Sequence, residues 1–305
     1  MDVTWGAGVS HEIAWGGLIA IYLFLAGVAG GAFLTAALTD LLGKKGPSKV
    51  VRSGAYIAPV SIIIGLALLV FDLGRPFSFW KLLFNVNFGS VMSIGVFIIS
   101  IFTALSVVYA YLIWVSSAAS GKIHFTTGAA QTAASVEVRS QGLHKAVAIF
   151  GVVFAVGTAT YTGFLLSAVS TNVFWSTPLL GIQGVPFLPF LFLVSALSTG
   201  LAAAMIGAFD SKDLTLYKKV DIVLIALELI LLVVLYASVK PVFFGGNLAT
   251  LFWLGVVLIG LLVPFVLTIY GVMRHKNLVL PVSSMVVLGG VFLRYFIVYA
   301  GQILR

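Results

Sequence analysis

The sequence of 305 residues contains no cysteine, and charged residues make up only 9% of it. Without cysteine the protein forms neither a disulfide nor a thiolate metal site, so any iron–sulfur or haem-thiolate centre must belong to a partner. So little charge is not the composition of a soluble globular protein. The net charge of +8 therefore has to be interpreted from its distribution along the chain.

Histidine is also scarce, and none of the four lies deep in an apolar stretch. His11, His124, His144 and His275 stand near the chain start, between apolar stretches or at the beginning of one. A haem held by two histidines needs them at membrane depth, so we expect no haem. No group of histidines and carboxylates has the spacing of metal ligands, and no phosphate-binding loop is present. We therefore expect no metal bound by this chain and no nucleic-acid partner.

Long apolar stretches are what the sequence has in abundance. About 20 residues of helix cross a bilayer, and eight stretches reach that length. We expect spanning helices at roughly 14–40, 52–72, 89–115, 144–170, 186–209, 218–239, 248–272 and 280–303. The predicted fold class is all-α, a polytopic membrane protein with one integral membrane domain over residues 1–305. Residues 116–142 are interpreted as a surface connection containing a short amphipathic helix.

The basic residues predict the orientation of these helices. An even number of spans puts both termini on one side, and one set of alternate loops holds 12 of the 17 Lys and Arg residues: Lys44, Lys45, Lys49, Arg52, Lys122, Arg139, Lys145, Lys212, Lys218, Lys219, Arg274 and Lys276. Basic loops stay on the cytoplasmic side. We therefore predict an inner-membrane protein with both termini outside, in the periplasm. No basic segment precedes the first apolar stretch, so we expect no removable signal peptide.

Two stretches 168 residues apart resemble each other. They are 23–31 (LFLAGVAGG) and 191–199 (LFLVSALST), and each leads to an aspartate, Asp40 or Asp210, before a basic loop. One interpretation is a duplication into two parallel four-helix bundles, about 14–170 and 186–303. The other is that helix interfaces converge on small residues at this spacing.

Tryptophan and phenylalanine gather in the predicted outer loops. Phe77, Phe79, Trp80, Phe84, Phe174 and Trp175 lie there. These rings are interpreted either as anchors at the membrane surface or as a docking surface for a partner subunit.

Polar side chains inside the apolar stretches are the candidates for function, because unpaired polar groups are costly in hydrocarbon. They are Tyr22, Tyr161, Thr162, Ser167, Glu228 and Arg294, with Asp72 at a helix end. At a rise of 1.5 Å per residue, Tyr22, Tyr161, Arg294 and Glu228 lie about 12 to 18 Å from the outer ends of their helices. The alternatives are a buried Glu228–Arg294 ion pair that fixes packing, packing tyrosines, and a solvated helix end at Asp72.

A quinone fits this set of side chains. Its ring and tail need an apolar slot, while each of its two carbonyls needs a hydrogen-bond donor or a proton relay.

Five segments resemble the NrfD/polysulfide reductase membrane-subunit family. They are 15–32 (WGGLIAIYLFLAGVAGGA), 72–76 (DLGRP), 90–93 (SVMS), 161–167 (YTGFLLS) and 294–295 (RY). The resemblance spans nearly the whole chain. It implies a haem-free, eight-helix subunit that binds quinone, either menaquinone or ubiquinone, near the outer face. It also implies two partners on that face, a four-cluster ferredoxin-like iron–sulfur subunit and a molybdopterin catalytic subunit, with membrane lipid around the chain.

The family's functional residues carry over unevenly. Tyr161 matches the quinone-site tyrosine of the Tyr-Thr-Gly motif. Tyr22 stands where the polysulfide reductase subunit has a quinone-contacting histidine, and Leu18 where it has an asparagine. Those two departures leave open the quinone type and the proton donor. Asp72 and Arg75 match a family motif to which only a supporting or proton-exit role is assigned.

The sequence thus predicts a membrane subunit that exchanges electrons between a quinone and an iron–sulfur partner. Tyr161, Tyr22, Thr162 and Ser167 are the predicted quinone-binding residues, and Glu228, Asp72 and Arg294 are the predicted proton-relay or tuning residues. The alternatives are a transporter or proton-translocating bundle without a redox role, and a purely structural anchor.

Overall fold

Eight helices that could cross a membrane make up the described part of the chain. The computed structural model describes residues 16–43, 48–72, 87, 89–119, 127–169, 172–182, 184–211, 214–239, 244–274 and 276–303. The spanning elements are α1 (Gly17–Leu42), α2 (Lys49–Asp72), α4 (Val91–Ala119), α5 (Thr127–Ser167), α6 (Leu188–Ile206), α7 (Thr215–Ser238), η5 (Leu251–Leu262) continuing as α8 (Val263–Met273), and α9 (Val279–Ile303). The all-α membrane fold is confirmed.

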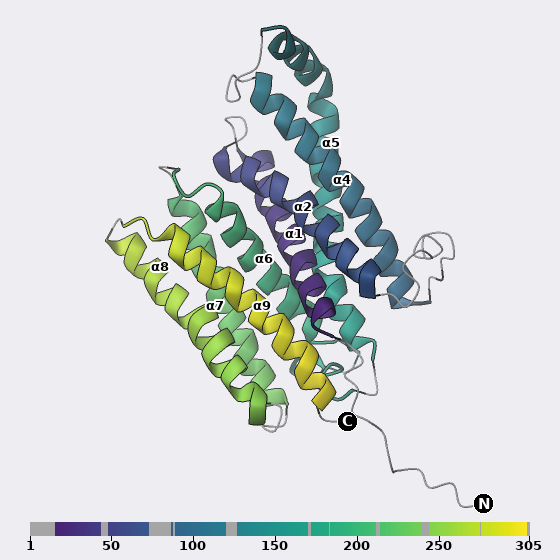
Figure 1. Cartoon of the computed structure of the whole chain (residues 1–305), viewed down its shortest axis with the longest axis vertical. Helices are drawn as coiled ribbons and strands as arrows, with labels where there is room; N and C mark the ends of the chain where they lie inside the picture. Colours follow the sequence, from purple (N-terminus) through teal and green to yellow (C-terminus); the bar gives the residue numbers. More distant parts are fainter. Residues whose placement is uncertain are drawn as a thin grey trace, which may run out of the picture.

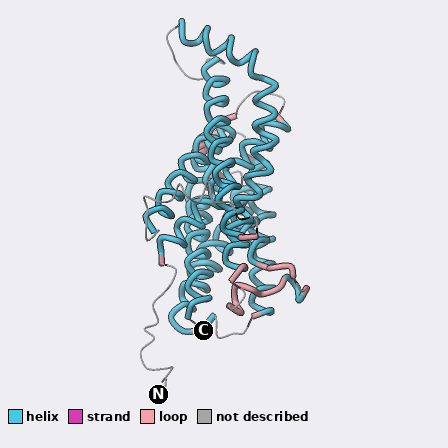
Figure 2. Tube along the Cα trace, turned by 90° about the vertical axis from the view of Figure 1, so that its right-hand side faces the viewer, coloured by secondary structure: helices cyan, strands magenta, loops and turns pink. Residues whose placement is uncertain are grey.

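Two elements differ from the predicted helices. The helix α5 is 41 residues long and begins at Thr127 rather than near residue 144, so it projects beyond the other helices (Figures 1 and 2). Residues 127–142 are rich in alanine and contain no proline, so they favour a helix that is continuous with the membrane span. This segment is too polar to lie in hydrocarbon. The seventh span begins as the π-helical segment η5 and becomes α-helical just before Pro264.

The helices form two groups of four (Figure 1). In the first bundle, α1 packs against α2 and α5, and α4 packs against α5. In the second bundle, α6 packs against α7 and α9, and η5 packs against α9. The order of contacts is thus similar in the two halves, and a duplication remains a prediction.

The helices α1 and α6 form the centre of the molecule. Their apolar windows are 67% buried, compared with 22% for α4 and 28% for α7. They cross where Gly31 of α1 meets Gly200 of α6, so closely that a Cβ atom on either glycine would overlap the backbone of the other helix. Small residues permit such close backbone contact between membrane helices.

The two ends of the bundle differ in charge. We call the end where α1 begins and α9 ends the terminal end, and the opposite one the far end (Figure 1). Among the Lys and Arg residues that the structure describes, Arg294 alone lies away from the far end, inside α9. The predicted clustering of basic residues is therefore present, and which side of the membrane the far end faces remains a prediction.

An exposed ion pair joins α2 to the end of α6. Lys49 forms it with Asp210, and this hydrogen bond holds the pKa of the Asp210 carboxyl below its usual value. Because both side chains are exposed, solvent screens the pair and it contributes little to stability.

Replacing Gly200 with alanine should destabilise the whole bundle, because the added methyl group would push α1 away from α6. Overpacking of this kind costs about 1–3 kcal/mol. The measurement is thermal unfolding of the purified protein in detergent, followed by tryptophan fluorescence. Gly16→Ala is the matched control, since a Cβ atom there meets nothing within 4 Å. Equal melting temperatures for the two variants would show that the α1–α6 contact does not limit stability.

Candidate functional site

Tyr22 of α1 and Tyr161 of α5 come together inside the first bundle. Their exposed fractions are 1% and 6%, and the two phenols lie near enough to interact electrostatically. The ring of Tyr161 lies against Gly95 of α4, where a Cβ atom would overlap it, and Tyr22 lies beside Gly65 of α2. All four helices of the first bundle therefore shape the surroundings of this tyrosine pair.

The hydroxyl-bearing residues around Tyr161 on α5 differ in whether their hydroxyls make a hydrogen bond. Thr162 is fully buried and donates a hydrogen bond to the carbonyl oxygen of Ala159 at 3.1 Å. Its only proton is therefore committed to its own helix. Thr158 and Ser167 have buried hydroxyls without a hydrogen-bond partner among the described residues. Such orphaned groups are costly, so they indicate places where water or a ligand binds.

A cavity of about 450 Å³ lies beside Ser167 at the terminal end. Its walls are the start of α4, the end of α5 and the connection that leads to α6: Val91, Phe164, Ser167, Ala168, Ser176, Pro178, Gly184, Val185 and Pro186. The volume falls in the range of small-molecule sites, and the lining is mostly apolar with a few hydroxyls. Tyr161 lies about 9 Å deeper along the axis of α5.

The connection that closes this cavity is fixed to α9. The indole nitrogen of Trp175 donates to the carbonyl oxygen of Ile297 at 2.8 Å, and the amide of Asn172 donates to the carbonyl oxygen of Gly301. Phe174 is fully buried and Trp175 is 4% exposed. The expectation that these two rings anchor at the membrane surface or dock a partner is therefore wrong: they are part of the core. Phe77, Phe79, Trp80 and Phe84 lie outside the described residues.

Arg294 is the centre of a second polar cluster. Its guanidinium stacks on the ring of Phe192, 3.9 Å from the ring centre, and donates to the carbonyl oxygen of Phe192 at 3.3 Å. It also reaches α1 at Gly27. Glu228 of α7 is 3% exposed and lies near enough to Arg294 for electrostatic attraction. Direct ion pairing is not observed, because no salt bridge within 4.0 Å joins the two among the described residues.

The predicted site residues thus separate into two clusters on opposite faces of α1. Tyr22, Tyr161 and the cavity at Ser167 belong to the first bundle, while Arg294 and Glu228 belong to the second. Asp72 is the exposed last residue of α2 and makes no hydrogen bond or ion pair with another described residue. The neighbouring Arg75 of its motif lies outside the described residues, as do His11, His124 and His275.

Two groups of polar residues were missed at the sequence level. Asp221 is 1% exposed and precedes Glu228 by seven residues on α7. Two residues seven apart lie on the same helix face, so the spacing from Glu228 could have identified Asp221 as a second buried carboxyl. At the far end of the first bundle, the hydroxyl of Tyr109 donates to Asp40 at 3.1 Å, and the imidazole of His144 lies 2.9 Å from the same carboxylate. Nothing in the sequence links these three.

No group of three or more metal-binding side chains occurs among the residues that the structure describes. The arrangement instead offers serine hydroxyls at a mostly apolar cavity and two phenolic hydroxyls deeper in the same bundle. Such a set can hold a small molecule by hydrogen bonds to its carbonyl oxygens.

The sequence is similar to proteins of known families. Residues 6–304 match the family model described as polysulphide reductase, NrfD. A polysulfide reductase chain of Wolinella succinogenes is 34% identical, and the match covers 99% of both proteins. Protein NrfD of Escherichia coli is 31% identical over 96% of both proteins. A selenate reductase subunit of Mesobacillus selenatarsenatis is 24% identical over 93% of this chain and 73% of its own length.

Arg294→Gln should destabilise the second bundle, because it leaves the buried Glu228 without its nearby positive charge. The expected loss is about 1–3 kcal/mol, the cost of leaving a buried polar group unsatisfied. Adding Glu228→Gln to the same chain should recover part of it, since coupled residues are not additive. Thermal unfolding of the two single variants and the double variant measures the coupling. Arg274→Gln, at an exposed position after α8, is the control. Strictly additive losses would mean that Glu228 and Arg294 do not interact.

Proposed function

Because the chain belongs to the polysulphide reductase NrfD family, we propose that it exchanges electrons between a membrane quinone and an iron–sulfur partner. Membership of this family makes it a membrane subunit of an oxidoreductase complex. The observation that carries the quinone assignment is the tyrosine pair, Tyr22 and Tyr161, in the same bundle as the cavity at Ser167 and about 9 Å deeper along α5. The cavity and the pair are both in the first bundle, at its terminal half.

The residues present fit a quinone. The cavity at Ser167 is mostly apolar, as a quinone ring and tail require, and the Ser167 hydroxyl has no partner among the described residues. Tyr161 and Tyr22 each carry a phenolic proton that can be donated to a carbonyl oxygen. When bound, a quinone or its quinol supplies the exchange of two electrons and two protons with the membrane pool. Either menaquinone or ubiquinone would be held by the same contacts.

The other predicted residues take different roles in this proposal. Thr162 supports the fold of α5 next to Tyr161, because its proton is bound to the backbone. Glu228 and Arg294 act as a proton relay or as charges that tune the site through α1, which Arg294 touches at Gly27. Asp72, exposed at the terminal end of α2, is a candidate for proton exit.

Partners are required, because a protein without cysteine holds no iron–sulfur cluster. The names of the relatives describe parts of a polysulfide reductase and a selenate reductase. This supports assembly with a four-cluster ferredoxin-like iron–sulfur subunit and a molybdopterin catalytic subunit. We place both partners at the terminal end, next to the cavity. Because the basic residues lie at the far end and basic loops stay in the cytoplasm, the terminal end is predicted to face the periplasm.

Tyr161→Phe tests the site directly. Removing the hydroxyl deletes one hydrogen bond, which should weaken binding of a fluorescent quinol-site inhibitor to the purified complex roughly 2- to 10-fold. Quenching of the inhibitor fluorescence measures the affinity, and quinol oxidation by the same complex measures the activity. Unchanged binding together with unchanged oxidation would remove Tyr161 from the site.

Two further variants separate a local effect from a general one. Tyr109→Phe removes a buried hydroxyl in the same bundle but at the far end, where it contacts Asp40, and should leave inhibitor affinity unchanged. Gly95→Ala keeps the Tyr161 hydroxyl but places a methyl group where its ring lies. It should therefore weaken binding as Tyr161→Phe does.

The competing function is a transporter or proton-translocating bundle without a redox role, centred on Glu228 and Arg294. It predicts substrate-driven flux in liposomes that contain this chain alone and no quinone. Family membership favours the redox function, and the flux measurement distinguishes the two.

A further inference from the structure

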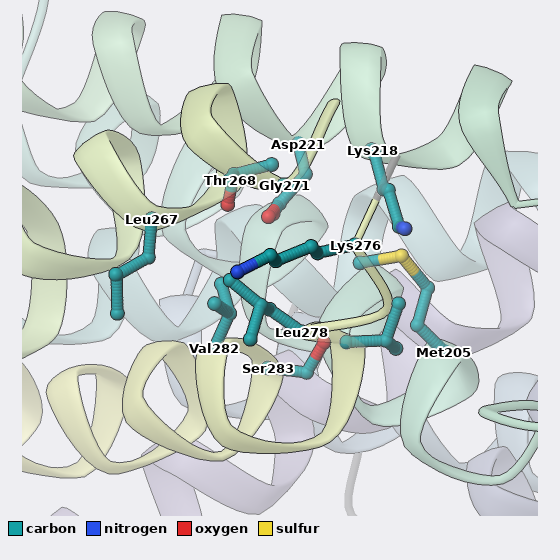
Figure 3. Close-up of a pocket in the computed structure, with 11 residues that line it drawn as sticks. Met205, Lys218, Asp221, Leu267, Thr268, Gly271, Lys276, Leu278, Val282 and Ser283 are labelled. Carbon is teal, nitrogen blue, oxygen red and sulfur yellow. The ribbon is translucent and has the colours of Figure 1, made fainter. Parts of the chain in front are cut away.

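A small pocket, shown in Figure 3, lies at the far end of the second bundle. The cavity at Ser167 lies at the terminal end of the first bundle. Four elements and one connection line the small pocket: Met205 from α6, Lys218 and Asp221 from α7, Leu267, Thr268 and Gly271 from α8, Lys276 and Leu278 from the connection, and Val279, Val282 and Ser283 from α9. Its volume of about 10 Å³ is that of about one water molecule.

The wall of this pocket contains a buried carboxyl group without a partner. Asp221 is 1% exposed, and neither of its oxygens accepts a hydrogen bond from the part of the chain that is described. The hydroxyl of Ser283, on the opposite wall, is also buried and has no hydrogen-bond partner among the described residues. A charged carboxylate in such a place is costly without a counter-ion or hydrogen bonds. The group is therefore more stable when it binds a proton or when water reaches it.

The charges around Asp221 do not neutralise it by direct contact. Lys218 on the same helix and Lys276 after α8 line the pocket, yet no ion pair within 4.0 Å joins either to Asp221 among the described residues. Figure 3 shows the Lys276 side chain extended across the pocket. The lining residues of α6, α8 and α9 carry no charge. Asp210, by contrast, is exposed at the same end and is paired with Lys49.

Asp221 is aligned with Glu228 along α7. The two carboxyls are seven residues apart on one face, about 10 Å along the axis, and they interact electrostatically. On α6, Ser195 lies next to Glu228, Ser198 follows one turn later, and Met205 reaches the pocket. The hydroxyl of Ser198 is buried without a hydrogen-bond partner in the described residues, while the hydroxyl of Ser195 lies within hydrogen-bonding reach of the Glu228 carboxyl.

A third helix, α9, adds to the residues of α7 and α6 named above, and we call the residues of the three helices together the column. Its residues Ser283, Gly290 and Arg294 follow a helical spacing of seven and four, so they share one face. Ser283 lines the pocket, Gly290 meets Thr199 of α6, and Arg294 lies near Glu228. Asp221 and Ser283 thus lie at the far-end pocket, and Ser195, Ser198, Glu228 and Arg294 lie deeper along the same three helices.

We propose that Asp221 binds a proton from the aqueous side at the far end and exchanges it with Glu228 along this column. A hydronium ion at the far end passes its proton through the water molecule in the pocket to the Asp221 carboxylate, which becomes a carboxylic acid and leaves neutral water behind. The proton then passes through water and serine hydroxyls to the Glu228 carboxylate, and Asp221 returns to its charged form. The link to electron transfer rests on the proposed function, whereas proton binding by Asp221 does not.

Infrared difference spectroscopy of the intact complex tests proton binding. A protonated carboxyl has a C=O stretching band that a carboxylate lacks, so lowering the pH should produce a band in the unaltered protein that Asp221→Asn removes. The matched control is Asp210→Asn, which changes an exposed aspartate at the same end and should keep the band. No band difference between Asp221→Asn and the unaltered protein at any pH would overturn the proposal.

A second measurement needs no variant. Dicyclohexylcarbodiimide is apolar and modifies carboxyl groups in their protonated form, so mass spectrometry of the treated complex should find label on Asp221 that increases several-fold as the pH is lowered. Label on Glu228 but none on Asp221 would contradict proton binding even if Asp221→Asn failed to assemble.

The coupling to electron transfer is measured in liposomes that contain the complex, with a pH-sensitive dye on the far-end side. Proton uptake during quinone reduction should fall several-fold in Asp221→Asn and remain normal in Asp210→Asn, while inhibitor affinity at the Tyr161 site stays unchanged. Normal uptake in Asp221→Asn would overturn the coupling. If the proposed quinone site were wrong, the inhibitor would not bind to the unaltered complex. The infrared band would still show whether Asp221 binds a proton.

Discussion

The close contact between α1 and α6 is the constraint on which the arrangement of the other helices depends. Gly31 and Gly200 allow the two backbones to approach closely at the centre of the molecule. The other helices of the first bundle pack around α1, and those of the second pack around α6. Because other helices pack on all sides of α1, its two faces contact two different groups of polar residues. Tyr22 faces Tyr161 in the first bundle, while Gly27 leaves room for the guanidinium of Arg294 from the second.

The buried polar groups divide according to whether they have partners. Tyr109, Thr162 and Trp175 all donate to groups inside the protein, so they stabilise the packing. Ser167, Asp221 and Ser283 lack partners among the described residues, and each of them lines a cavity. In hydrocarbon an unpaired polar group is too costly to be incidental. Ser167, Asp221 and Ser283 therefore indicate where small molecules or water bind.

These cavities lie at opposite ends of opposite bundles. The cavity at Ser167 is at the terminal end of the first bundle, and the Asp221 pocket is at the far end of the second. Arg294 and Glu228 lie between them, in contact with α1 through Gly27. A charge change at the tyrosine pair would therefore act on Glu228 and Arg294 across a single helix, which is the physical argument for the proposed link between electron and proton transfer.

The sequence by itself determined the eight membrane helices, because their length and apolarity are local properties, and it identified Tyr161, Tyr22, Glu228 and Arg294 as buried polar groups. It also predicted the gathering of basic residues at one end. Only the tertiary structure decided that these four residues form two clusters, that Phe174 and Trp175 belong to the core, and that Asp221 is buried. Depth along a helix can be counted from the sequence, whereas the direction in which a side chain points depends on which helices pack beside it. Asp221 lies near a basic helix end, where a carboxylate is usually solvated, and only the packing of α6, α8 and α9 around it removes it from water.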